Sequence, residues 1–178
     1  MVNMATGAKV KSVLALLQHW ATAIGVRADD DSIQSPKDLD GKVYAGFGSP
    51  IEVPMLSTVI KEDGGTGEFD TVTLNTSAYE AVYAGTADFT IPFETWESIE
   101  AEIRGTPFKH FEFADYGMPD NYAVLVDCNT DWLEANPDTA AAFVQAVQKG
   151  YEFAQKNPTE AGDILIEANP DAFSTDEG

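Results

Sequence analysis

The residues best suited to hold a small molecule lie together in the segment 92–97. Two aromatic rings, Phe93 and Trp96, can form flat walls for a planar ligand. Two carboxylates, Glu94 and Glu97, can accept hydrogen bonds from an amino group on that ligand or pair with its positive charge. This combination favours recognition of a planar, nitrogen-bearing ring.

Two other interpretations apply to the same residues. Trp96 can instead pack with Ile99 and Ile103 on the inner face of a helix, with both acids in solvent. Paired acids also occur in glycoside hydrolysis, but here they lie on one turn with no second group in view. We therefore expect no catalytic residues in this segment.

A second candidate contact is the loop Gly46–Pro50, which precedes an expected helix. Its glycines let a ligand approach the backbone, and Gly48 and Ser49 can offer N–H donors at the helix start. An ordinary tight turn explains the pattern equally well, and the lysine of a phosphate-binding loop is absent.

The turn 115–122 carries Tyr116 and Tyr122, which either line a cleft or merely cover the turn. The junction 75–79 is also polar, although its side chains suit helix caps better than ligand contacts. Arg27 and Arg104 are the only arginines, and neither lies at a junction where a ligand is expected, which disfavours an anion site.

These segments are positioned by elements that alternate between strand and helix. Ser35, Ser49, Asn136 and Asn157 each precede a proline, a pattern typical of helix starts. Short alternation of strands and helices predicts βαβ units and a mainly parallel sheet. The expected strands are 12–17, 22–27, 42–47, 69–74, 87–92, 108–113 and 122–126, and the expected helices are 50–62, 77–85, 95–104, 137–156 and 159–168.

Composition excludes several classes of function. The chain has 178 residues, 30 of them acidic and 10 basic, and its net charge of -20 repels nucleic acid and anionic lipid. Cys128 is the only cysteine, so we expect a small buried thiol and neither an internal disulfide nor a cysteine–histidine metal site. No cofactor is expected.

Several segments carry a family resemblance through their order and spacing. They are Ile33–Lys42, Glu80–Asp88, Phe93–Glu97 with Glu100 and Gly105, Tyr116–Tyr122, and Lys149–Ala154 with Asn157-Pro158. Together they resemble the NMT1/THI5-like solute-binding family, and in particular its thiamine-pyrimidine branch. That family includes a yeast synthase with a cysteine-rich active site, which Cys128 alone does not reproduce.

The resemblance implies a two-lobed clamshell of the type II periplasmic-binding-protein kind, an α/β fold whose ligand is delivered to an ABC permease. We expect residues 1–28 to hold hinge strands and remnants of lobe 1, 29–126 to form lobe 2, and 127–178 to form C-terminal helices packing on the lobes. The family pattern calls for more chain before Val10 and after Gly178, so we expect a truncated piece with exposed apolar surface that self-associates.

The resemblance also implies roles for individual residues. Phe93, Trp96 and Tyr122 would wall the ring, and Glu97, or else Glu94, would accept from its amino group. Further contacts would come from Gly48, Ser49, Tyr116, Gln18 and His19.

The expected ligand is a thiamine-pyrimidine precursor. Sulfonate, nitrate or riboflavin-type solutes, and a ligand-sensing regulatory domain of the same fold, stay open as alternatives. The stretch Met1–Lys11 lacks a signal peptide's apolar core, and we expect the full-length protein to be periplasmic or anchored outside the cytoplasm.

Overall fold

The computed structural model describes residues 7–173 and divides into two compact units. Unit 2 comprises Leu17–Ala123, and unit 1 comprises the described residues on either side of it. Unit 2 includes residues 17–28 because the strand over 24–27 pairs inside its sheet. The expected lobe boundaries at residues 28 and 126 stay a prediction.

Unit 2 is built on one five-stranded sheet with the strand order β4-β3-β5-β2-β6. In this sheet β3 is parallel to β4 and to β5, whereas β2 is antiparallel to β5 and to β6. Four strands thus run one way, as the sequence predicts. The strands are β2 (Ile24–Arg27), β3 (Val43–Gly46), β4 (Asp70–Thr73), β5 (Phe89–Thr90) and β6 (Phe108–Phe111).

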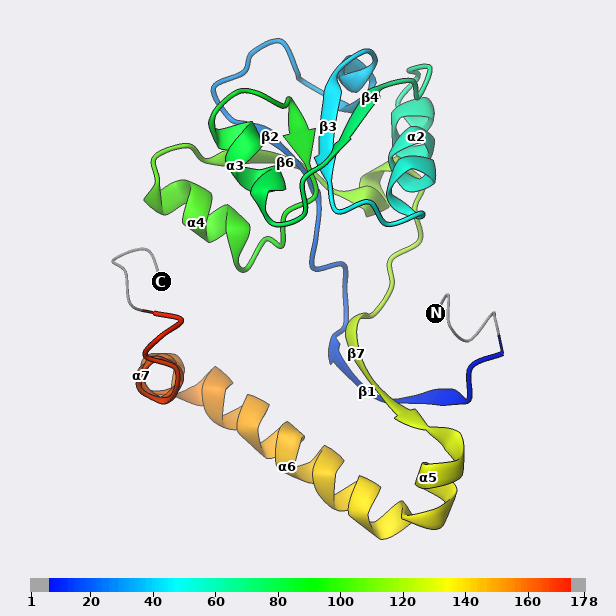
Figure 1. Ribbon diagram of the computed structural model, residues 1–178, viewed down its shortest axis with the longest axis vertical. Coiled ribbons are helices and arrows are strands. Elements are labelled where there is room, and N and C mark those ends of the chain that lie inside the picture. Colours follow the sequence, from blue (N-terminus) through cyan, green and yellow to red (C-terminus); the bar gives the residue numbers. More distant parts are fainter. Residues whose placement is uncertain (1–6, 174–178) are drawn as a thin grey trace. The chain divides into compact units, whose positions relative to one another are not determined.

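Helices cover both faces of this sheet (Figure 1). Neighbouring residues of β3 point to opposite faces, so Tyr44 joins one apolar cluster and Ala45 the other. The first cluster includes residues of α2 and lies against both short 3-10 helices, and the second includes residues of α3 and α4. The helices are η1 (Pro36–Leu39), α2 (Glu52–Glu62), α3 (Ser77–Tyr83), α4 (Glu97–Ile103) and η2 (Phe113–Tyr116).

Unit 1 contains a two-stranded sheet, β1 with β7, and three helices. Asn129 caps the first of them, because its side-chain oxygen accepts from the backbone N–H of Trp132 at 3.0 Å. The sequence analysis missed this helix. The elements are β1 (Val10–Leu17), β7 (Ala123–Asn129), α5 (Thr130–Ala135), α6 (Pro137–Lys156) and α7 (Pro158–Ala168).

The expected asparagine caps work differently from the sequence prediction. Asn136 and Asn157 do precede α6 and α7, but neither side chain accepts from the helix that follows. Instead each amide donates backward, Asn136 to the carbonyl of Trp132 at 2.9 Å and Asn157 to that of Phe153 at 3.0 Å. Both residues therefore close the helix before them.

The apolar side of α6 is poorly covered. Ala140 is its one buried residue, and Phe143 and Tyr151 are about half exposed. An apolar cavity of about 290 Å³ in unit 1 is lined by Val13, Val126, Cys128, Trp132 and Phe143, among others. Cys128 is only half-buried there, so the expected buried thiol is partly accessible. Within residues 7–173, no helix is long and apolar enough to cross a membrane.

Candidate ligand-binding site

The carboxyl ends of the parallel strands in unit 2 meet at one edge of the sheet, where ligands bind in open α/β folds. The loops after β3 and β5 lie there, and so does the segment before β2, because β2 runs in the opposite direction. A backbone bridge between Thr22 and Phe93 ties that segment to the loop after β5. The N–H of Glu94 also donates to the carbonyl of Ala21 at 3.0 Å.

The loop after β5 exposes the two aromatic rings that the sequence singles out. Phe93 is 40% exposed and Trp96 59% exposed. Ile99 and Ile103 are exposed too, and the buried face of α4 is formed by Ser98 and Ala101 instead. The alternative in which Trp96 packs inward with these isoleucines is therefore wrong.

Glu97 begins α4 and turns back onto this loop. Its Oε2 accepts a hydrogen bond from the backbone N–H of Phe93 at 2.8 Å. Its own carbonyl accepts from the Tyr83 hydroxyl at 3.0 Å. Burial raises the pKa of Tyr83 to about 12, so this hydroxyl is a stable donor. Glu97 thus fixes the loop that carries Phe93, and its carboxylate also interacts with Tyr79, whose pKa it raises.

Glu94 faces a different environment. Burial lowers the pKa of His110, and the charge of Glu94 opposes that shift. Burial also raises the pKa of Glu112, and the negative charge of Glu94 raises it further. Glu94 thus acts electrostatically on His110 of β6 and on Glu112, the residue after that strand.

The loop after β3 is held by a carboxylate that the sequence analysis did not select. Glu52 accepts from the N–H of Gly48 through Oε2 and from the N–H of Ser49 through Oε1, both at 3.2 Å. Gly48 has φ +84, and a Cβ there would lie 2.9 Å from Cγ2 of Thr73. The two backbone donors expected to face a ligand are therefore already in use, which leaves the Ser49 hydroxyl.

Tyr79 of α3 lies between the two loops, and the sequence analysis did not select it either. Its ring centroid is 5.7 Å from that of Phe47 in an edge-on arrangement. Burial raises the pKa of Tyr79, and the charges of Glu97 and then Glu52 add to the effect. A tyrosine two residues into a helix that follows a strand is the signal that could have found it.

The segments before β2 and before β7, here called the two crossing segments, are partly engaged with each other. Nδ1 of His19 lies 2.5 Å from Oδ2 of Asp120, and the backbone N–H of Trp20 donates to Oδ1 at 3.1 Å. Gln18 is exposed, and Tyr122 is 62% exposed. Asp120 thus connects the segment before β2 to the segment before β7.

Tyr116 is the expected site residue that the structure separates from the others. It ends η2 and packs against the main apolar cluster. Burial and then the charge of Asp63 raise its pKa, and a Cβ on its neighbour Gly117 would meet Glu62. Tyr116 therefore lies by the end of α2, whereas Gly48 and Ser49 lie by its start.

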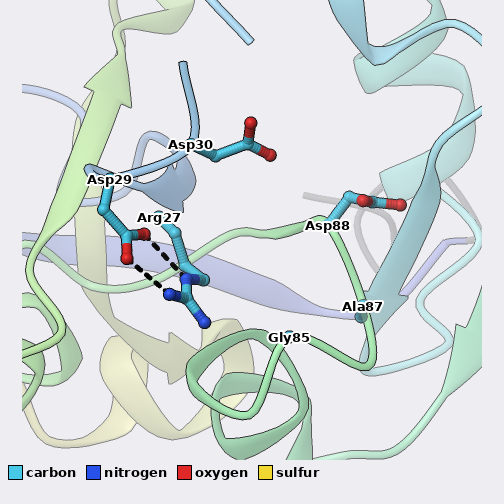
Figure 2. Close-up of a pocket in the computed structure, with 6 residues that line it drawn as sticks. All are labelled: Arg27, Asp29, Asp30, Gly85, Ala87 and Asp88. Atoms are coloured by element: carbon cyan, nitrogen blue, oxygen red, sulfur yellow. Dashed lines mark hydrogen bonds and ion pairs between the residues drawn. The ribbon is translucent and has the colours of Figure 1, made fainter. Parts of the chain in front are cut away.

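A cavity of unit 2 lies at the other edge of the sheet (Figure 2). It measures about 320 Å³, and Asp88, at the amino end of β5, and Asp30 contribute to its lining. Arg27 also lines it but is engaged, since its Nε and Nη2 donate to the two oxygens of Asp29 at 2.8 and 2.5 Å. Among the residues described, no group of three His, Cys, Asp or Glu can hold a metal ion.

Two solved structures that share this fold are named as binding proteins. The chain superimposes on the periplasmic aliphatic sulphonate binding protein SsuA of Escherichia coli with a TM-score of 0.65 at 17% identity, over 93% of this chain and 56% of that one. The ligand binding component of an ABC-type import system from Staphylococcus aureus gives 0.64 at 18% identity, over 94% and 57%. The likeness confirms the expected fold class, an α/β lobe of the periplasmic-binding-protein type.

Sequence similarity provides the narrower assignment: residues 1–161 match the NMT1/THI5-like family, and the chain belongs to it. The chain is also 28% identical over 161 residues to the formylaminopyrimidine-binding protein of Halalkalibacterium halodurans. That match covers 88% of this chain and 48% of the relative, so the chain spans about half the length of that protein.

Proposed function

We propose that this chain is part of the substrate-binding component of an ABC importer and captures a formylaminopyrimidine or a similar planar nitrogen heterocycle. The observation that carries the proposal is the exposure of Phe93 and Trp96 beside Glu97 at the carboxyl edge of the sheet. The similarity to the formylaminopyrimidine-binding protein of Halalkalibacterium halodurans supports the same ligand class.

In this proposal Phe93, Trp96 and Tyr122 wall the ring of the ligand. Glu97, which also holds the N–H of Phe93, accepts from its amino group, and Glu94 is the second choice. The Ser49 hydroxyl contributes from the facing loop. Gln18 and His19 contribute from the segment before β2, where Asp120 holds His19 in place.

Binding without catalysis is the second element of the proposal. The described residues do bring a serine and a histidine together, with Oγ of Ser98 at 2.8 Å from Nε2 of His110. Ser98 is only 6% exposed, in the first turn of α4, so its hydroxyl is closed to a substrate. We therefore assign this pair to the anchoring of α4 and not to an enzyme reaction.

The partner in this proposal is an ABC permease, and the place of action is outside the cytoplasm. The sulphonate-binding neighbour is named as a periplasmic protein, and the Staphylococcus aureus neighbour as part of an import system. The net charge of -20 agrees with a partner that is neither nucleic acid nor an anionic lipid surface.

Calorimetric titration tests the ligand class. Formylaminopyrimidine, methanesulfonate and riboflavin are titrated separately into the chain, and the pyrimidine alone is expected to release heat with saturation. The same titrations into Phe93→Ala and Trp96→Ala variants should weaken pyrimidine binding, since each substitution removes stacking area. Saturable heat from methanesulfonate or riboflavin, with none from the pyrimidine, would contradict the proposal.

Self-association of the chain completes the proposal. Unit 1 exposes Trp132, Phe143 and Tyr151 around two apolar hollows, one of them next to Val147 and Gly150. A second copy covering this face would bury these rings, while the charge of -20 opposes association until salt screens it.

Sedimentation equilibrium at low and high salt checks this association. The wild-type chain is expected to dimerise more strongly at high salt, and Phe143→Lys to stay monomeric. Gln145→Lys, which adds the same charge at an exposed position of α6, is the matched control. A wild-type chain that stays monomeric at every salt concentration would refute self-association.

A further inference from the structure

The start of α2 is occupied by a carboxylate of the chain itself. Gly48 and Ser49 present two backbone N–H groups of the loop after β3, and the helix dipole makes such a position attractive to anions. Each oxygen of Glu52 accepts one of these N–H groups, at 3.2 Å in both cases. An anionic ligand would have to displace the Glu52 carboxylate to reach them.

The carboxylate is also confined from behind. A Cβ built on Gly46 would lie 2.5 Å from Oε2 of Glu52 and would collide with the ring of Tyr44, so glycine alone leaves room for both side chains. Tyr44 is 2% exposed, and its ring lies beside this carboxylate. Burial and then the charge of Glu52 raise the pKa of Tyr44, which keeps its hydroxyl neutral.

The loop after β5 also has a backbone N–H group that donates to a carboxylate of the chain. Glu97 accepts the N–H of Phe93, and Tyr79 lies within electrostatic reach of both Glu97 and Glu52. The segments 46–51, 75–80 and 91–97, which surround these carboxylates, contain no lysine or arginine. In both loops, therefore, a carboxylate of the chain accepts the backbone N–H groups. No lysine or arginine in these segments balances the negative charge of the two carboxylates.

We propose that Glu52 is a specificity-determining residue of this site: it takes the backbone donors an anion would need, so the site rejects sulfonates and other anions and accepts neutral or protonated nitrogen heterocycles. This inference rests on the proposed function, because it concerns the same edge of the sheet. It adds a reason for selectivity that the aromatic walls cannot supply, since rings stack on planar molecules of either charge.

Amide NMR tests the inference without reference to the natural ligand. Methanesulfonate is titrated into the ¹⁵N-labelled chain while the Gly48 and Ser49 amide signals are followed. The wild-type signals should not move in a saturable way. In Glu52→Ala both should shift with saturation, with affinity for the anion higher by about tenfold or more, as expected when charge-assisted hydrogen bonds become available.

Glu62→Ala is the matched control, because it removes one negative charge from the other end of α2. Should Glu52→Ala fail to fold, Glu52→Gln serves in its place; its amide oxygen satisfies one N–H and frees the other, so a weaker saturable shift is expected. Saturable shifts in the wild-type chain, or none in either Glu52 variant, would overturn the inference.

A parallel titration with formylaminopyrimidine separates the two proposals. No binding of the pyrimidine, with anion binding gained in Glu52→Ala, would count against the proposed function and leave the role of Glu52 intact. The opposite result is that the wild-type chain binds the pyrimidine and Glu52→Ala gains no anion binding. That result would support the proposed function and show that Glu52 does not determine specificity.

Discussion

Nε2 of His110 in β6 lies 2.8 Å from Oγ of Ser98 in α4, a hydrogen bond that joins the helix behind Trp96 to the sheet. Burial lowers the pKa of His110, and the charges of Glu94 and Glu102 oppose that shift. Folding therefore favours the neutral form of His110. Its hydrogen bond with Ser98 fixes the start of α4 next to the loop that carries Phe93.

This hydrogen bond predicts a pH dependence of stability. As the pH falls through about 6.5, His110 of the unfolded chain takes up a proton before His110 of the folded chain does. Its contribution to the free energy of unfolding is complete above that pH and is lost below it, down to the folded pKa. Urea titrations of wild type and His110→Gln at pH 7.5 and 5.5 should give a stability difference that shrinks at the lower pH. An equal difference at both values would contradict the assignment.

Replacing Glu97 by glutamine should weaken binding of the pyrimidine. The glutamine side chain can still accept from the N–H of Phe93, so the loop is preserved and the loss reports the missing negative charge. A loss of about 1.5–3 kcal/mol is expected for a hydrogen bond to a charged group. Calorimetry measures it against Glu102→Gln, which makes the same change at an exposed position of α4. Unchanged affinity would remove Glu97 from the site.

Gly48→Ala should destabilise the chain more than Gly41→Ala. Both glycines have positive φ, +84 and +70, and an alanine in that region costs roughly 1–2 kcal/mol. A Cβ at Gly41 meets nothing within 4 Å, whereas one at Gly48 lies 2.9 Å from Cγ2 of Thr73. We expect about 1 kcal/mol more loss at Gly48 from this overlap. Chemical denaturation measures both, and adding Thr73→Ser should recover the excess; a persistent excess would refute the steric explanation.

Asp120→Asn should loosen the connection between the two crossing segments. Hydrogen bonds from His19 and from the N–H of Trp20 lower the pKa of Asp120, so the ionised carboxylate is the form that holds them. Hydrogen exchange at the Trp20 amide should become faster in the variant. Asp115→Asn, in the turn that precedes it, is the control. A Trp20 amide that exchanges at the wild-type rate would show that Asp120 does not hold the segment.

The positions of the strands in unit 2 could be predicted because each is a short apolar run bounded by turn residues. The prediction placed them within a few residues, and the largest difference was at β5, where only Phe89 and Thr90 pair. Helix α5 was missed because Asn129 follows the expected strand 122–126, where an N-cap was not sought. Its sequence signal was nevertheless present.

The candidate site was less predictable for a physical reason. Phe93, Trp96 and Glu97 stand out by residue type, and the structure brings them together. The spacing Ser49-Pro50-Ile51-Glu52 is that of a capping box, which predicts the return of Glu52 to the N–H of Ser49. Its second contact, with the N–H of Gly48, depends on the room left at Gly46, a tertiary property that residue spacing does not reveal.

The position of β2 inside the sheet has a consequence for synthesis of the chain. β2 is made first among the strands of its sheet, yet it lies between β5 and β6, where Val26 is opposite Phe89 and Lys109. Strands β5 and β6 are synthesised only after much of unit 2 has left the ribosome. Until then the apolar residues of β2 have no partner strand. Pairing across so many intervening residues is slow, and we expect the nascent chain to depend on chaperones until residue 111 has emerged.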